Sequence, residues 1–195
     1  ISEQIAAWTS MPVGVVTLSE RHGGRQVSRA GFDAMVSEVL EHLSGFEGRG
    51  LLADVWHPAR THLLGTSGTV TTIAGVHLRL PRYDRRKVDG IWLSDGQVDA
   101  VIEALVAMDY EQRAANPCIG RERADLVLAG CAILQAIRLT WPSPRLRVAD
   151  RGLREGILSE LMHADGAWGA AQPNRTPQAP LGSRDGQSWR GGARP

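Results

Sequence analysis

The spacing of hydrophobic residues predicts a chain in which helices alternate with short strands. Residues 28–43 contain apolar residues at the i, i+3, i+4, i+7 spacing of an amphipathic helix, and Gly45 ends the pattern. The apolar positions of this helix are Phe32, Met35, Val36, Val39, Leu40 and Leu43. Residues 62–64 predict a strand, which a glycine-containing loop joins to a predicted helix over residues 70–76.

The middle of the chain repeats this alternation. Residues 88–93 predict a short extended segment. Ser94 and the glutamine three residues later, Gln97, form a capping box at the start of a helix. The buried face of that helix is predicted to be Val98, Val101, Ile102, Leu105 and Val106.

The last part with clear periodicity ends in another strand and helix. A long helix is predicted from about Arg121 to Arg138. Residues 146–149 predict a strand, residues 150–152 a turn and residues 153–162 a final helix. Strands that alternate with helices in this way favour an α/β domain with a mixed sheet.

The N-terminal segment shows a different pattern. Apolar residues alternate loosely over residues 4–19, and Pro12 and Gly14 interrupt them. This pattern predicts two short strands that meet at a turn. The chain is therefore expected to begin inside a sheet, which is an unusual place for a domain to start.

Composition divides the chain into a domain and a tail. With 195 residues, of which 43% are hydrophobic, the chain can form one domain with a substantial core. Residues 164–195 are rich in Gly, Pro, Gln, Arg and Ser, and they are predicted to be disordered because they bury too little apolar surface. The predicted division is therefore residues 1–163 and residues 164–195. Trp168 and Trp189 could form a docking motif in the tail, which is otherwise interpreted as solvated.

Charge and cysteine content exclude several classes of function. The formal net charge of +1 gives no general attraction to nucleic acid or to a membrane surface. No segment approaches the roughly 18 apolar residues of a membrane span, and no signal peptide is recognised. Cys118 and Cys131 form neither a metal-binding spacing nor a disulfide framework. The expected setting is a reducing, cytoplasmic one.

The strongest candidate for chemistry is the loop Gly65, Thr66, Ser67, Gly68 and Thr69. It lies between a predicted strand and a predicted helix. Glycines allow a ligand to approach the backbone, and free amides at the helix start favour an anion such as phosphate. The loop lacks the lysine of a P-loop, so a tight turn with Ser/Thr capping stays an equal alternative.

Two charged segments are weaker candidates. Arg121 to Asp125 opens the predicted long helix, where an arginine is unfavourable for the helix dipole unless it contacts an anion. The alternative is a surface arginine that pairs with Glu122 or Asp125. For the segment from Asp150 to Gly156, a structural role is favoured.

Four segments in order resemble the Ppx/GppA (exopolyphosphatase/guanosine pentaphosphate phosphatase) family. Residues 65–72 resemble the glycine-threonine loop of the family, and residues 123–134 its R-A-D, A-G, I-L helix. Residues 150–158 are similar to its closing D-x-G-L-R-E-G-I-L segment, and residues 11–20 to one of its strands. The resemblance extends from about residue 8 to residue 162.

The resemblance implies an actin-like fold, with this chain forming most of the second of two ribonuclease-H-like lobes. The lobe would be a mixed sheet flanked by helices, followed by the disordered tail. Residues 65–69 would line the nucleotide or polyphosphate side of the cleft between the lobes, and Arg123 matches a family position that contacts phosphate.

The resemblance also implies what this chain does not supply. The family's D-I-G-G-G-S-T-E motif is expected just before Ile1, and the first lobe is expected to precede it. The carboxylates that bind Mg²⁺ and activate water would lie in those parts, so no catalytic residue is predicted here. The intact protein would hydrolyse inorganic polyphosphate or guanosine pentaphosphate.

Two alternatives to this function stay open. The chain could be a non-catalytic lobe that binds a phosphate ligand or a partner chain. An actin-like sugar kinase or chaperone ATPase is also possible, although residues 153–156 resemble the phosphatases more closely. Without the first lobe, the surface around Ile5, Trp8 and Gly65 is expected to be exposed and to favour association, for example as a homodimer.

Overall fold

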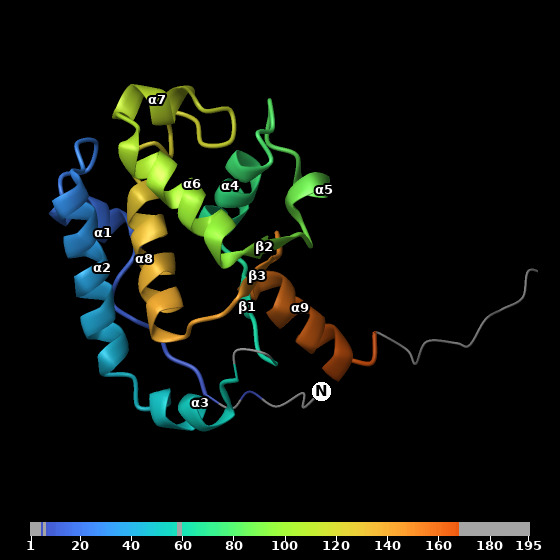
Figure 1. Cartoon of the computed structure of the whole chain (residues 1–195). Helices are drawn as coiled ribbons and strands as arrows, with labels where there is room; N and C mark the ends of the chain where they lie inside the picture. Colours follow the sequence, from blue (N-terminus) through green and yellow to red (C-terminus); the bar gives the residue numbers. More distant parts are fainter. Residues whose placement is uncertain (1–4, 6, 58–59, 168–195) are drawn as a thin grey trace, which may run out of the picture. The chain divides into compact units, whose positions relative to one another are not determined.

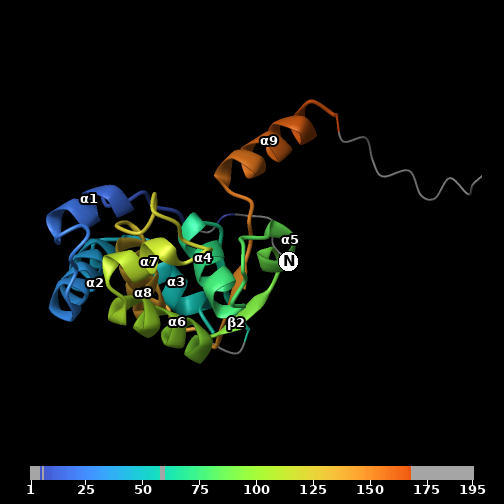
Figure 2. The same cartoon turned by 90° about the horizontal axis from the view of Figure 1, so that it is seen from above.

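The computed structural model describes residue 5, residues 7–57 and residues 60–167. The chain divides into two compact units, Ile1–Glu155 and Gly156–Pro195. The first unit is a mixed α/β structure in which helices flank a small sheet (Figures 1 and 2). Most of helix α9 (Leu153–Ala164) belongs to the second unit, and none of its side chains is buried. Within the described ranges, no helix is long and apolar enough to cross a membrane.

The sheet of the first unit has three short strands in the order β1-β3-β2. β1 (Leu63–Gly65) runs parallel to β3 (Arg145–Val148), and β2 (Trp92–Ser94) runs antiparallel to β3. Leu146 of β3 lies opposite both Leu63 and Leu93, so these residues share one face. Leu93 and Leu146 are buried on this face, against the helices. The predicted strands over residues 62–64 and 146–149 are confirmed.

The opposite face of the sheet is exposed. Leu64 and Trp92, which both lie opposite Arg147, are 60% and 39% exposed. The guanidinium groups of Arg145 and Arg147 lie 4.5 and 5.0 Å from the ring centroid of Trp92. These cation–π contacts cover part of the aromatic surface that the sheet presents on this side.

Eight helices of the described chain precede α9. They are α1 (Val15–Arg21), α2 (Arg29–Ser44), α3 (Arg49–Val55), α4 (Gly68–His77), α5 (Arg85–Val88), α6 (Asp95–Ala107), α7 (Tyr110–Ala115) and α8 (Val127–Thr140). α8 lies between α2 and α6 and contacts α1 and α4 as well (Figure 1). Nine of its 14 residues are buried, as expected for a helix that packs against several others.

Two predicted helices are confirmed together with their end signals. α2 buries Phe32, Met35, Val36, Val39 and Leu43, and it ends at Gly45. α6 begins with the predicted capping box. Ser94 N donates to Gln97 Oε1 at 2.8 Å, and Gln97 N donates to Ser94 Oγ at 3.2 Å.

The prediction of two N-terminal strands is wrong. Residue 5 and residues 7–14 have no regular structure, and residues 15–21 form α1. Gly14 is the N-cap of this helix, and its N–H donates to Thr17 Oγ1 at 3.3 Å. Leu18 and Ser19 are buried side by side in α1, which packs against α8. Burial against a neighbouring helix therefore outweighs the loose alternation in the sequence. Ile5 and Trp8 are exposed, as expected, at 82% and 79%, whereas association stays a prediction.

Two further boundaries differ from the prediction. The long helix α8 begins at Val127 rather than near Arg121, and residues 121–126 form turns. The extended segment predicted over residues 88–93 is shorter, because Val88 ends the short helix α5 and β2 begins only at Trp92. The tail predicted over residues 164–195, with both tryptophans, lies outside the described residues from 168 onward.

Arg79 has an unusual backbone conformation at the end of α4. It is the only non-glycine residue with a positive φ among those that the structure describes, at 50°. Arg79 N donates to Val76 O at 3.0 Å and Leu80 N donates to Gly75 O at 3.1 Å. This pair of bonds is a Schellman motif, in which glycine usually occupies the left-handed position.

Replacing Arg79 by Gly is therefore expected to stabilise the fold. A side chain with a Cβ costs about 1 kcal/mol in this conformation, and glycine removes that cost. Urea unfolding should show a higher midpoint for Arg79→Gly than for the parent chain. Arg79→Ala keeps the Cβ and should give no such gain. Equal stability of the two variants would contradict the expectation.

The buried thiol of Cys131 should make stability depend on alkaline pH. Burial raises the pKa of Cys131 from about 9 to about 12. The folded chain therefore keeps the thiol neutral while the unfolded chain ionises above pH ~9. The contribution of the Cys131 thiol to the free energy of unfolding is complete below that pH. It is lost between about pH 9 and 12, by at most about 1.4 kcal/mol per pH unit.

Urea unfolding under reducing conditions at pH 8 and pH 10.5 measures this loss. Cys131→Ala should unfold with a weaker dependence on pH over the same interval, although its stability at pH 8 is lower. A parallel decline in the parent chain and in Cys131→Ala would show that the thiol contributes nothing to it.

Candidate functional site

The predicted glycine-threonine loop connects β1 to α4. Gly65 is the last residue of β1, and Ser67 caps α4 with its side chain, whose Oγ accepts from Val70 N at 3.4 Å. The first intrahelical bond runs from Thr71 N to Ser67 O at 3.2 Å. The N–H groups of Gly68 and Thr69 precede that bond, so they are free to bind an anion at the positive end of the helix dipole.

Two glycines let this loop pack closely against its neighbours. A Cβ on Gly65 would lie 2.6 Å from Val70 Cγ2. A Cβ on Gly130, in α8, would lie 2.1 Å from Thr69 Oγ1. Both positions need glycine for this reason, and α8 packs against the side chain of Thr69 at Gly130.

Replacing Gly130 by Ala should displace Thr69 and destabilise the chain. The new methyl group cannot fit beside Thr69 Oγ1 without movement, and overpacking of this kind costs about 1–3 kcal/mol. Thermal unfolding measures the loss. Gly96→Ala is the control, because a Cβ on Gly96 meets no atom within 4 Å, and its stability should be equal or higher. The expectation fails if the two variants are equally stable.

Arg123 lies beside the loop, in the turns that precede α8. A Cβ on Gly68 would stand 3.6 Å from Nη1 of Arg123, so the guanidinium lies over the start of α4. The side chain of Arg123 is exposed and makes no ion pair with any described carboxylate. The structure thus brings Arg123 and the loop together, although the two segments are more than 50 positions apart in the sequence.

Two side chains that the sequence reasoning missed fix the turn of Arg123. Arg113 is 2% exposed, and its Nε donates to Ala124 O at 3.0 Å. Ser19 is 3% exposed, and its Oγ donates to Asp125 O at 2.7 Å. Two successive carbonyls that follow Arg123, those of Ala124 and Asp125, are therefore held by side chains from other elements. These tertiary bonds explain why α8 begins later than its apolar pattern predicts.

Two hollows meet at the loop. The first has a volume of about 260 Å³ and is lined by Val15, Ser67, Gly68, Thr69, Thr72, Arg123, Leu126 and Val127. The second, of about 290 Å³, includes Gly65, Thr66, Ser67 and Thr69 in a mainly apolar lining. Every residue predicted for the site lines at least one of the two hollows. Their binding of phosphate stays a prediction.

The other charged candidates make contacts within the protein. Asp150 Oδ2 accepts from Tyr83 Oη at 2.9 Å and from Arg85 Nε at 3.1 Å. These contacts join the end of β3 to the region of α5, which supports a structural role for Asp150. Arg121 pairs with Glu111 at 3.1 Å rather than with a carboxylate of its own segment.

A metal site is not formed by the residues that the structure describes, because no three His, Cys, Asp or Glu side chains among them could hold an ion together. The lining of the first hollow contains no carboxylate. The donors available there, amides, hydroxyls and one guanidinium, suit an anion instead.

Comparisons with known proteins agree on one family. The model of the Ppx/GppA phosphatase family matches residues 1–165. A Ppx/GppA family member from Aquifex aeolicus is 27% identical, with a TM-score of 0.63, over 80% of this chain and 49% of that chain. An exopolyphosphatase-like protein is 25% identical, with a TM-score of 0.66, over 80% of this chain and 50% of that one.

A further solved structure is similar in fold. An exopolyphosphatase from Cytophaga hutchinsonii has a TM-score of 0.70 at 22% identity, over 83% of this chain and 51% of that chain. The chain thus spans about half the length of these solved structures. No curated protein sequence matches the chain.

Proposed function

The chain belongs to the Ppx/GppA phosphatase family, and from this membership we propose that it is the phosphate-binding lobe of a protein that hydrolyses terminal phosphoanhydride bonds. Inorganic polyphosphate and guanosine pentaphosphate are the proposed substrates. The single observation that carries the proposal is the position of Arg123 beside Gly68, at the start of α4, where its Nη1 lies 3.6 Å from the place that a Cβ on Gly68 would occupy.

The geometry of the loop supports binding of a phosphate chain. Oxygens of one phosphate would accept from the N–H groups of Gly68 and Thr69 and from the hydroxyl of Ser67. The guanidinium of Arg123 would donate to the same or the adjacent phosphate, and charge-assisted bonds of this kind are stronger than neutral ones. Fixed donors would also stabilise charge that develops on the phosphate during hydrolysis.

The proposal assigns no catalytic base and no metal ligand to the described residues. We propose that the carboxylate that orients water lies in the first lobe or in the segment that precedes this one. The carboxylates that would bind Mg²⁺, which neutralises phosphate oxygens, are proposed to lie there too. The proposed architecture is accordingly actin-like, with two ribonuclease-H-like lobes and the ligand between them. The part of each solved relative that this chain leaves uncovered supports this division.

A second candidate is a lobe that binds a phosphate ligand or a partner chain without catalysis. This second candidate is favoured for the 195-residue chain taken alone, because the hollow that Arg123 lines contains no carboxylate. The two candidates share the same binding residues and differ only in whether a complete protein turns the ligand over.

Phosphate release separates the candidates. The longer protein that contains this chain should release phosphate from polyphosphate or guanosine pentaphosphate with Mg²⁺ present, whereas the 195-residue chain should bind but release none. Adding the first lobe in trans should restore release. If the longer protein is inactive on both substrates, hydrolysis is ruled out. Release by the chain alone would show that the catalytic carboxylates lie within it.

A further inference from the structure

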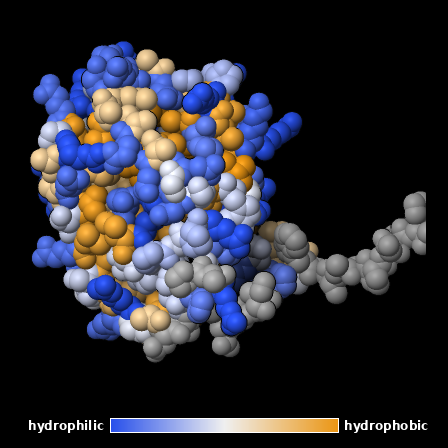
Figure 3. Space-filling view, viewed as in Figure 1, coloured by the Kyte–Doolittle hydropathy of each residue, from blue (hydrophilic) through white to orange (hydrophobic). Residues whose placement is uncertain are grey.

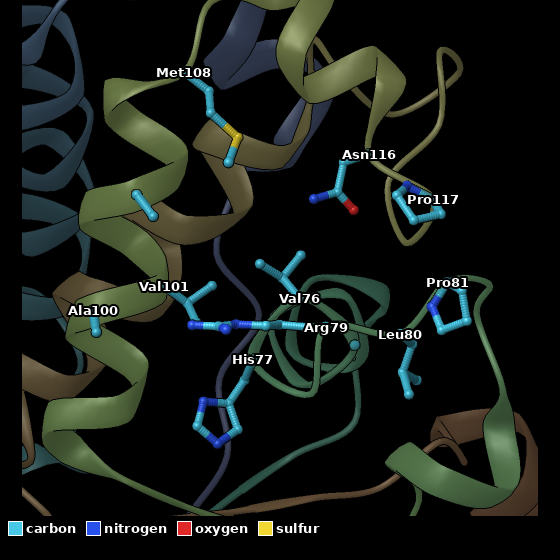
Figure 4. Close-up of a pocket in the computed structure, with 12 residues that line it drawn as sticks. Val76, His77, Arg79, Leu80, Pro81, Ala100, Val101, Met108, Asn116 and Pro117 are labelled. Atoms are coloured by element: carbon cyan, nitrogen blue, oxygen red, sulfur yellow. The ribbon is translucent and has the colours of Figure 1, made fainter.

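A larger hollow lies at the opposite end of α4 from the candidate site. Its volume is about 530 Å³, and it opens between the end of α4, the side of α6 and the loop after α7 (Figure 4). None of its lining residues lines either of the two hollows at the glycine-threonine loop. Ala100 and Ala104 of α6 face it, and these short side chains leave the space that larger ones would fill.

The strained residue of the fold lines this hollow. Arg79 keeps a left-handed conformation at a position where glycine would fit without strain. Its side chain extends across the hollow toward α6, as Figure 4 shows. Backbone strain that is kept where a better residue exists is a reason to look for a function of the side chain.

The charged residues that line the hollow are all basic. Arg79 and His77 are its basic residues, and none of the lining residues is acidic. The guanidinium of Arg79 makes no hydrogen bond or ion pair to any side chain that the structure describes. An anion that entered the hollow would therefore meet a cation without a competing carboxylate.

A fixed polar group and an apolar wall complete the lining. Asn116 Oδ1 accepts from Cys118 N at 2.9 Å, so this bond orients the side-chain amide and leaves its NH₂ group as a donor. Figure 4 shows the amide directed into the hollow. Most of the other lining side chains are apolar, among them Val76, Val101 and Met108. On the face shown in Figure 3, hydrophobic groups also reach the surface in separate patches among hydrophilic ones.

We propose that this hollow binds a small amphipathic anion, with a carboxylate or phosphate group held by Arg79 and an apolar body against α6. Its volume lies within the roughly 300–1,000 Å³ of small-molecule sites, which are mainly apolar with a few fixed polar groups. A bare inorganic ion would leave the apolar wall unused. The proposal is independent of the proposed hydrolase function, because it involves none of the same residues.

The test is an NMR titration of the ¹⁵N-labelled chain with phenyl phosphate and, separately, with phenylacetate. Either probe should shift the amides of Ala100, Ala104 and Asn116 saturably, and the tighter probe identifies the preferred anion. Inorganic phosphate and benzyl alcohol each lack one half of the recognised chemistry, so each should bind there at least tenfold more weakly. Shifts confined to Gly68 and Thr69 would place the probe at the other site and overturn the proposal.

Arg79→Gln should weaken binding of the better probe at least tenfold. Arg79→Gly should weaken it to the same extent while raising the unfolding midpoint, a combination that a purely structural role for Arg79 does not produce. Arg86→Gln is the matched control, because Arg86 is exposed on α5 and does not line the hollow; its affinity should be unchanged. If Arg79→Gln binds as well as the parent chain, the proposal is wrong.

Discussion

Replacing Arg113 by Met is expected to lower the free energy of unfolding by about 3–5 kcal/mol. The guanidinium of Arg113 is buried and donates to the backbone carbonyls of Arg25, Met108 and Ala124. Methionine matches the aliphatic stem of arginine, but it leaves these three carbonyls without their donor. Each unpaired buried polar group costs about 1–3 kcal/mol. Removing the buried charge also removes its desolvation cost, but this gain offsets only part of the cost of the three unpaired carbonyls.

Urea unfolding measures this loss, with Arg86→Met as the control. Arg86 is exposed and its side chain makes none of the hydrogen bonds found in the described part of the chain, so its replacement should change stability by less than about 0.5 kcal/mol. Burial also lowers the pKa of the Arg113 guanidinium, which shows that its charge is held at a desolvation cost. A loss below about 1 kcal/mol for Arg113→Met would mean that its bonds to the backbone contribute little.

Replacing Arg123 by Gln is expected to weaken binding of tripolyphosphate to the chain by about 10- to 100-fold. One charge-assisted hydrogen bond contributes about 1.5–3 kcal/mol, and glutamine removes the charge while it keeps a polar side chain. Isothermal titration calorimetry at low and at physiological salt measures the change. The salt dependence of binding should also become weaker, because one cation fewer contacts the phosphates.

Arg121→Gln is the matched control for Arg123→Gln. The two arginines lie two positions apart, but Arg121 pairs with Glu111 and does not line the hollow beside the loop. Its replacement should change the affinity less than twofold. An equal effect of both substitutions would show that general positive charge, rather than the position of Arg123, attracts the ligand.

The sequence predicted those parts of the fold whose signals are local. The spacing of Phe32 to Leu43 and the box of Ser94 and Gln97 depend on neighbouring positions only, and the helices they predict are present. The strand that ends at Gly65 and the cap at Ser67 are local in the same sense.

Other features depend on contacts between distant segments, so pattern alone could not predict them. Val15 to Arg21 is a helix because Leu18 is buried against neighbouring helices, although its residues alternate like a strand. The start of α8 depends on bonds to the carbonyls of the preceding turn, from Ser19, which lies 106 positions from its partner, and from Arg113 of another helix, which lies 11 positions from its partner. Arg113 itself stands in a polar segment and gives no sequence signal of burial.

The candidate site shows the same division. The loop residues 65–69 were recognisable because glycines and hydroxyls follow a strand directly. Arg123 was predicted at a helix start, where the structure has a turn, yet it still reaches the loop. The role of Gly130 was missed, because a glycine inside an apolar helix does not reveal that Thr69 lies against it.

Phosphate binding by the loop before α4 and Arg123 is measured most directly by titrating the ¹⁵N-labelled 195-residue chain with tripolyphosphate and following its NMR spectrum. If the loop before α4 and Arg123 form a phosphate site, the amides of Gly68 and Thr69 and the side chain of Arg123 should shift saturably and with one affinity. Shifts that are absent there, or that concentrate on other arginines of the described surface, would contradict the account.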